Sequence, residues 1–182
     1  SLVNGTENVT SLVIFHSVVA LSPCPKLKVL VWREKLCTND TLPFPLHTLT
    51  ALTKLYISTP TLSDDCVFPK TLRELSFSIK DGSVRVDRLT GLSNLVWLEL
   101  HVRNERDLFV LAPLTALTWA EITDSPVATL PTSLKECEMT LNNDFDFSEL
   151  TNLTRLVLTL RSRPSVIFPT QLEELRIKGD LG

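Results

Sequence analysis

Few side chains in this sequence have the types and spacing that catalysis or metal binding requires. Its 182 residues include three histidines (His16, His47 and His101) and four cysteines, and no two cysteines have the close spacing of a zinc ligand set. It contains no H-E-x-x-H motif, no G-x-S-x-G motif and no glycine-rich phosphate loop. We therefore predict that the protein is not an enzyme and that it has no catalytic residues, no cofactor and no metal site.

Composition narrows the class of protein further. The net charge is −3, 43% of the residues are hydrophobic and 21% are charged, as in a folded globular chain. This charge does not favour binding to nucleic acid, and no apolar run reaches the ~18 residues of a membrane span. We expect one domain that covers residues 1–182.

A repeated apolar pattern organises the chain and must position any binding residues. The pattern apolar-x-x-apolar-x-apolar occurs nine times, for example as Leu95, Leu98 and Leu100. A unit of this length cannot bury its apolar face alone, so successive units must stack into a solenoid, with one short strand in each. The nine copies begin near residues 9, 27, 52, 72, 95, 117, 134, 153 and 172.

The segments before the strands have two styles, such as Leu49-Thr50-Ala51-Leu52 and Phe68-Pro69-Lys70-Thr71-Leu72. With the apolar pattern, they resemble the leucine-rich repeat family over about residues 8 to 180, in irregular repeats of no assignable subfamily. The resemblance implies an α/β-type leucine-rich repeat solenoid. It would have one curved parallel sheet of about nine short strands on its concave side, with loops and short 3-10 or helical turns on the convex side. The asparagine that this family places after each strand is matched only by Asn142, so other contacts must satisfy the backbone there.

Alternate residues of the predicted strands should face the concave side and form the candidate binding surface. Trp97 and Trp119 hold the same position in neighbouring copies, so we expect them roughly 4.8 Å apart. Tryptophans among glutamates favour a protein partner with basic residues, through hot-spot and cation–π contacts. Alternatively, the two tryptophans stack on each other and the glutamates only solvate the face. The predicted partner-binding residues are Tyr56, Trp97, Glu99, His101, Trp119, Glu121, Glu136 and Glu138.

In this arrangement His101 lies one strand from Glu121. We interpret the two as solvated neighbours rather than as an acid–base pair.

A second contact is predicted at the N-terminal end, where the first two strands are apolar on both faces. One interpretation is that the N-terminal segment or upstream sequence covers these strands. The other is self-association or a partner contact at this end. The residues concerned are Val13, Phe15, Val29 and Val31.

We thus predict a non-enzymatic protein–protein interaction module that binds a basic protein segment on its concave face. One alternative is an extracellular adhesion or receptor-type ectodomain that recognises a surface protein or a glycan. Another is a structural spacer or repeat segment of a larger protein. Location stays open: Cys37 and Cys137, which we interpret as buried free thiols, favour the cytoplasm, whereas a secreted or cell-surface protein is favoured by the N-x-S/T sequons at Asn4, Asn8, Asn39 and Asn152.

Overall fold

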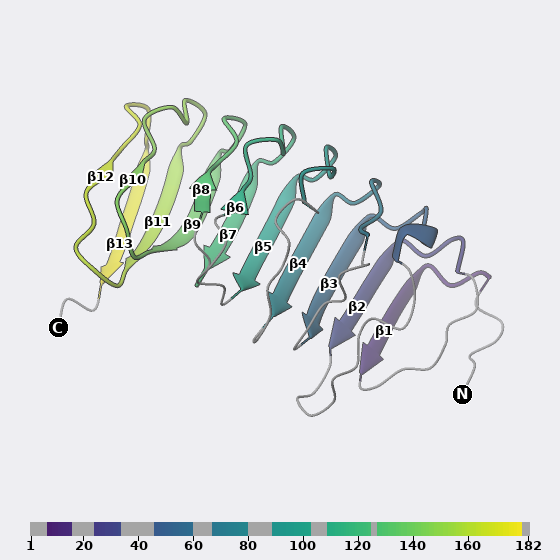
Figure 1. The fold of residues 1–182 in the computed structure, drawn as a ribbon. Coiled ribbons are helices and arrows are strands. Elements are labelled where there is room, and N and C mark those ends of the chain that lie inside the picture. The colour runs from purple at the N-terminus through teal and green to yellow at the C-terminus, as the bar shows by residue number, and fades with distance from the viewer. Residues whose placement is uncertain are drawn as a thin grey trace.

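The computed structural model describes residues 7–15, 24–33, 46–59, 67–79, 89–102, 109–124 and 127–179. Nine strands form one parallel sheet in which the strands of successive copies lie side by side and pair in sequence order (Figure 1). The nine-stranded parallel sheet expected from the apolar pattern is therefore present, and the molecule is a β-solenoid of stacked coils. Its strands are β1 (Ser11–Phe15), β2 (Val29–Arg33), β3 (Lys54–Thr59), β4 (Glu74–Ile79), β5 (Trp97–Val102), β7 (Trp119–Thr123), β9 (Glu136–Leu141), β11 (Arg155–Leu160) and β13 (Glu174–Gly179).

The prediction of an α/β-type solenoid is wrong. Within the described residues, the one helical element is the three-residue 3-10 helix η1 (Leu46–Thr48). Elsewhere the described return segments are turns and short parallel strand pairs, so this is an all-β coil. The pairs join β6 (Phe109–Val110) to β8 (Val127–Thr129) and β10 (Phe145–Asp146) to β12 (Val166–Ile167).

Leucines three residues apart explain why the segments before the strands are turns and not α-helices. Leu92 N–H donates to Leu89 O at 3.0 Å, and Leu95 N–H donates to Leu92 O at 3.0 Å. These bonds span three residues, whereas an α-helix needs bonds that span four. In the proline style the same turn forms from Pro69 O to Leu72 N–H. Each such turn points its leucine into the core.

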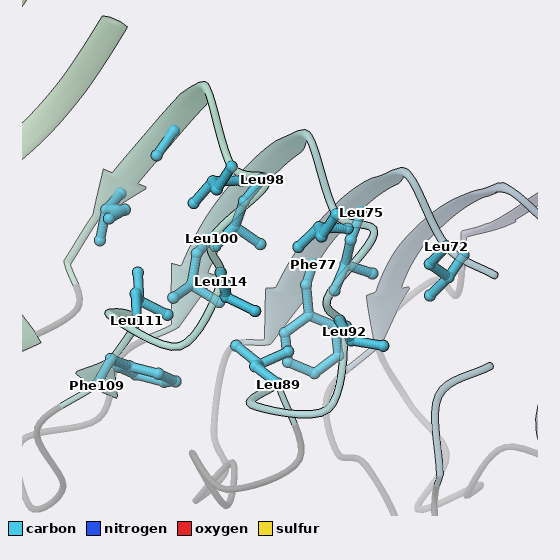
Figure 2. Close-up of a cluster of buried hydrophobic side chains, with 14 of the residues drawn as sticks. Leu72, Leu75, Phe77, Leu89, Leu92, Leu98, Leu100, Phe109, Leu111 and Leu114 are labelled. Atoms are coloured by element: carbon cyan, nitrogen blue, oxygen red, sulfur yellow. The ribbon is translucent and has the colours of Figure 1, made fainter. Parts of the chain in front are cut away.

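Strand and turn residues meet in a continuous core beneath the sheet (Figure 2). Leu98 and Leu100 point inward from β5 and belong to the same buried cluster as Leu89 and Leu92 of the turn before that strand. Burying a side chain of this size contributes about 1.5–3 kcal/mol, and the pattern repeats in each coil. No helix among the described residues is long and apolar enough to cross a membrane.

A regular set of backbone hydrogen bonds joins successive coils just before each strand. The carbonyl of Lys28, for example, accepts the N–H groups of both Thr53 and Lys54. Such double acceptance recurs at all eight steps between neighbouring strands of the sheet, and it fixes their register. The acceptors are Thr10, Lys28, Thr53, Arg73, Val96, Thr118, Lys135 and Thr154.

A second set of bonds uses the side chain directly before the first leucine of a copy. Thr71 Oγ1 donates to Leu52 O at 2.6 Å, and Ser133 Oγ donates to Leu117 O at 2.7 Å. Here polar side chains of several types satisfy backbone carbonyls of the preceding coil, as a single residue type would in a regular ladder. The other members of this set are Asn94, Asn152 and Gln171.

Candidate functional site

The candidate site lies on the face of the nine-stranded sheet that points away from the core, here called the open face. Alternation along β5 turns Leu98 and Leu100 into the core and leaves Trp97, Glu99 and His101 on the open face. All eight predicted partner-binding residues alternate with buried residues in the same way. The open face therefore carries the predicted site on β3, β5, β7 and β9.

The aromatic row of the open face consists of Tyr56, Trp97 and Trp119. The two indole rings stack with centroids 4.7 Å apart and planes 4° from parallel, as the in-register pairing of β5 and β7 requires. Tyr56 packs against Trp97 with ring centroids 6.3 Å apart and a tilt of 53°. All three rings are half-buried. Each indole thus gives one ring face to the other, Trp97 also contacts Tyr56, and part of each ring stays accessible to solvent.

Tyr56 is held in place by β4. Its hydroxyl donates to Glu74 Oε2 at 2.9 Å, and Lys54 Nζ lies 2.8 Å from Glu74 Oε1. Burial raises the pKa of Tyr56, and the hydrogen bond to Glu74 raises it further. Burial acts to raise the pKa of Glu74, but the hydrogen bonds from Lys54 and Tyr56 outweigh it and lower the pKa. Both carboxylate oxygens of Glu74 therefore already have a partner, Tyr56 or Lys54.

The acidic centre of the site consists of Glu99, His101 and Glu121, two residues along the strands from the tryptophans. His101 Nε2 lies 2.8 Å from Glu99 Oε1 and 3.9 Å from Glu121 Oε1. The other ring nitrogen, Nδ1, contacts the hydroxyl of Thr123 on β7. These contacts orient the imidazole with Nε2 between the two carboxylates. The prediction was that His101 and Glu121 are solvated neighbours. In the structure both ring nitrogens of His101 have contacts, so the ring is held in place.

The pKa of Glu121 is raised in the folded protein. Burial is the largest cause, and burial with the carboxylates of Glu99 and Glu138 outweighs the lowering by His101 and Lys178. The register explains this result, because Glu99, Glu121 and Glu138 lie side by side on three successive strands. An additional positive charge beside Glu121 would therefore stabilise its ionised form.

The outer glutamates of the site are already paired with cations of the same face. Glu136 lies 3.1 Å from Arg155 Nη1, and Glu138 lies 3.2 Å from Lys178 Nζ. The sequence prediction did not include these cations. Register reveals Arg155, which lies directly beside Glu136, but only the reach of its long side chain brings Lys178 from β13 to β9.

The apolar N-terminal patch is separate from this site. Val13 and Phe15 of β1 are 49% and 61% exposed, whereas Val29 and Val31 of β2 are half-buried. Among the residues that the structure describes, none covers Val13 or Phe15. The patch therefore stays a candidate for contact, and the N-terminal residues 1–6 that were expected to cover it lie outside the description.

The structure describes some of the cysteines and sequon residues named in the sequence analysis and not others. Cys137 is a buried free thiol, and burial raises its pKa to about 12. Cys37 lies outside the described residues, as do the sequon residues Asn4 and Asn39. The two described sequon residues, Asn8 and Asn152, are exposed, and each hydrogen-bonds to a neighbouring coil.

No protein-family model matches this sequence, and no curated protein matches it either. The chain is a repeat protein of the parallel β-solenoid kind, with a half-buried aromatic row and an acidic centre on its open face.

Proposed function

We propose that this protein is a non-enzymatic binding module of leucine-rich repeat type, and that its open face receives a basic segment of a protein partner. The observation that carries the proposal is the aromatic row of Tyr56, Trp97 and Trp119 directly beside the carboxylates of Glu99 and Glu121. Aromatic anchors next to unsatisfied charge are typical of binding hot spots.

The aromatic row is suited to binding because it is large and already ordered. Each aromatic side chain offers about 150–250 Å² of surface in total. The stacked indoles hold one another in place, so little conformational entropy is lost when a partner covers them. A flexible surface of the same area would bind more weakly.

The charges of the open face point to where a partner's cation would bind. Glu74, Glu136 and Glu138 already have cationic neighbours, as described above. Glu99 and Glu121 share a single histidine. A lysine or arginine of the partner would therefore be placed at Glu99 and Glu121, with its apolar stem along the tryptophans.

A selection from a random peptide library displayed on phage tests this proposal. Wild-type protein should enrich peptides rich in Lys and Arg, and a folded Trp97→Ala/Trp119→Ala variant should not. Thr159→Ala, a change on the open face of β11, is the matched control and should enrich the same peptides as the wild type. Enrichment without a basic bias, or equal enrichment by the double variant, would contradict the proposal.

A structural role is the second candidate, because the face-to-face stack of Trp97 and Trp119 stabilises the sheet whether or not a partner binds. On this hypothesis the double variant loses stability, and the selection enriches no peptide family with either protein. Because the loss of stability is expected in either case, the peptide selection separates the two candidates.

A further inference from the structure

We propose that Glu99, His101 and Glu121 form a site for a divalent transition-metal ion, with Zn²⁺ as the best match. One nitrogen and two carboxylate oxygens, from two neighbouring strands, lie within 4.8 Å of one another. Sequence spacing predicted no metal site because the donors are brought together by strand pairing and not by a local motif.

The distances between the donors suit a small ion. Zinc bonds to nitrogen and oxygen of about 2.1 Å place tetrahedral ligands about 3.4 Å apart. His101 Nε2 lies 2.8 Å from Glu99 Oε1 and 3.9 Å from Glu121 Oε1, so the observed separations bracket this value. All three donors lie within 4.8 Å of one another, so side-chain rotations alone would bring them to an ion. The backbone of the two strands would not need to move.

The histidine is oriented as a metal ligand requires. A ligating imidazole generally donates its second N–H to an oxygen, which fixes both the tautomer and the plane of the ring. In this protein the Nδ1 of His101 contacts the hydroxyl of Thr123, and Nε2 faces the carboxylates. With Nδ1–H donating to Thr123, the lone pair of Nε2 would bind a metal ion in place of the contact with Glu99.

The surrounding charge also favours a dication. Glu99 and Glu121 are in register on adjacent strands, and Glu138 continues the row on β9. Lys178 pairs with Glu138 and its charge also acts on Glu121, while His101 lies between the carboxylates of Glu99 and Glu121. A bound dication would neutralise this pair of half-buried carboxylates without a large desolvation cost, because the three donors replace its water.

The donor set selects among ions. Ca²⁺ and Mg²⁺ prefer six or more oxygen ligands, whereas an imidazole with two carboxylates suits Zn²⁺ and its neighbours in the first transition row. Three protein ligands leave a fourth position for water or for a side chain of a partner. The metal proposal does not rest on the proposed protein binding, but a bound ion and a partner's cation would compete for the carboxylates of Glu99 and Glu121.

Titration of the purified protein with zinc chloride in a chelator-free buffer, followed by calorimetry, tests the proposal. We expect one Zn²⁺ per chain, and His101→Gln and Glu121→Gln should each weaken binding by about 10-fold or more. Cobalt should produce visible absorption bands of a low-symmetry site in the wild type and not in these variants. Circular dichroism verifies that each variant is folded.

His47→Gln is the matched control, because it removes an exposed histidine that lies outside the cluster. It should leave the affinity for zinc unchanged. Absence of zinc binding to the wild type would overturn the proposal, as would equal affinity in His101→Gln. Calcium binding as tight as zinc binding would also overturn it, because it would show a nonspecific acidic patch. A failed metal titration would leave the peptide selection above unaffected, so the two proposals can be judged separately.

Discussion

Lys178 of β13 reaches across β11 to Glu138 of β9, with Nζ 3.2 Å from Oε1. Between the two strands lies Val157, in register with Glu138 and only 5% exposed although it belongs to the open face. The ion pair and its neighbours therefore cover Val157 on this part of the open face. The middle strands β5 and β7 keep their aromatic and acidic side chains accessible, which places the candidate site there.

Removal of this ion pair should have a small effect on stability. Both side chains remain partly exposed, and exposed ion pairs contribute about 0–1 kcal/mol. We expect Lys178→Gln to change the free energy of unfolding by less than about 1 kcal/mol in urea. A loss of several kcal/mol would show that the pair organises the sheet and does more than cover Val157.

Core leucines should differ in importance along the solenoid, although the repeat makes them equivalent. Leu98 is fully buried, whereas Leu175, at the same position of the last strand, is 41% exposed. Leu98→Ala should cost about 2–5 kcal/mol in urea unfolding, and Leu175→Ala clearly less. Equal losses would contradict the exposure of Leu175 on β13.

Each polar side chain that links two coils should contribute to the free energy of unfolding. Ser133 Oγ donates to Leu117 O at 2.7 Å in a half-buried position, and its loss leaves that carbonyl with one donor fewer. We expect Ser133→Ala to cost about 0.5–1.5 kcal/mol in chemical denaturation. Its exposed neighbour Thr132 is the control, and Thr132→Ala should stay within about 0.5 kcal/mol of the wild type. A similar effect of both substitutions would contradict the role given to Ser133.

Two glutamates of the open face should change stability with pH in opposite directions. Folding raises the pKa of Glu121, chiefly through burial, so folding is favoured with this group protonated and that advantage is lost as pH rises through the folded pKa. Glu121→Gln should therefore raise the unfolding temperature at pH 7 relative to the wild type. Near pH 4 the difference should shrink, because both Glu121 and its replacement are then neutral.

The pKa of Glu74 is lowered because hydrogen bonds from Lys54 and Tyr56 outweigh burial, so its contribution is present above the ordinary value of 4.5 and is lost as pH falls through the folded pKa. Glu74→Gln should lower the unfolding temperature at pH 7, and the loss should diminish on acidification. Thermal unfolding of both variants between pH 4 and pH 7 checks these signs. A shift of the same sign for both would refute the assignment of their charges.

The buried thiol gives a prediction about reactivity. Because burial raises the pKa of Cys137 to about 12, it carries almost no thiolate at pH 8. We expect iodoacetamide to leave Cys137 unmodified in the folded protein and to label it after denaturation, as measured by peptide mass spectrometry. Rapid labelling of Cys137 in the native protein would contradict its placement in the core.

Much of the fold could be predicted from the sequence, because apolar residues at fixed spacing state both the number of strands and their inward faces. Leu98 and Leu100 are buried as the pattern requires, and Trp97 pairs with Trp119 as expected. The α/β class, which the family resemblance implied, was wrong, and of the helical or 3-10 turns only the 3-10 helix η1 is found among the described residues. The three-residue spacing of Leu89, Leu92 and Leu95 was a signal for tight turns in the sequence itself.

The candidate site was only partly predictable, because its chemistry depends on the reach of side chains. Strand alternation placed Glu99, His101 and Glu121 on one face, but not the imidazole between the two carboxylates. It also gave no sign of the pairing of Glu138 with Lys178, which lies two strands away. Long side chains such as that of Lys178 form contacts between strands that are not neighbours in the sheet.

The affinity of one selected basic peptide, measured with and without the aromatic row, tests the central claim most directly. We expect the Trp97→Ala/Trp119→Ala variant to bind the peptide at least ~2 kcal/mol more weakly than the wild type, or about 30-fold. Added salt should weaken binding to the wild type, because the carboxylates of Glu99 and Glu121 take part. Equal affinity of the two proteins, unchanged by salt, would show that the open face is not the binding surface.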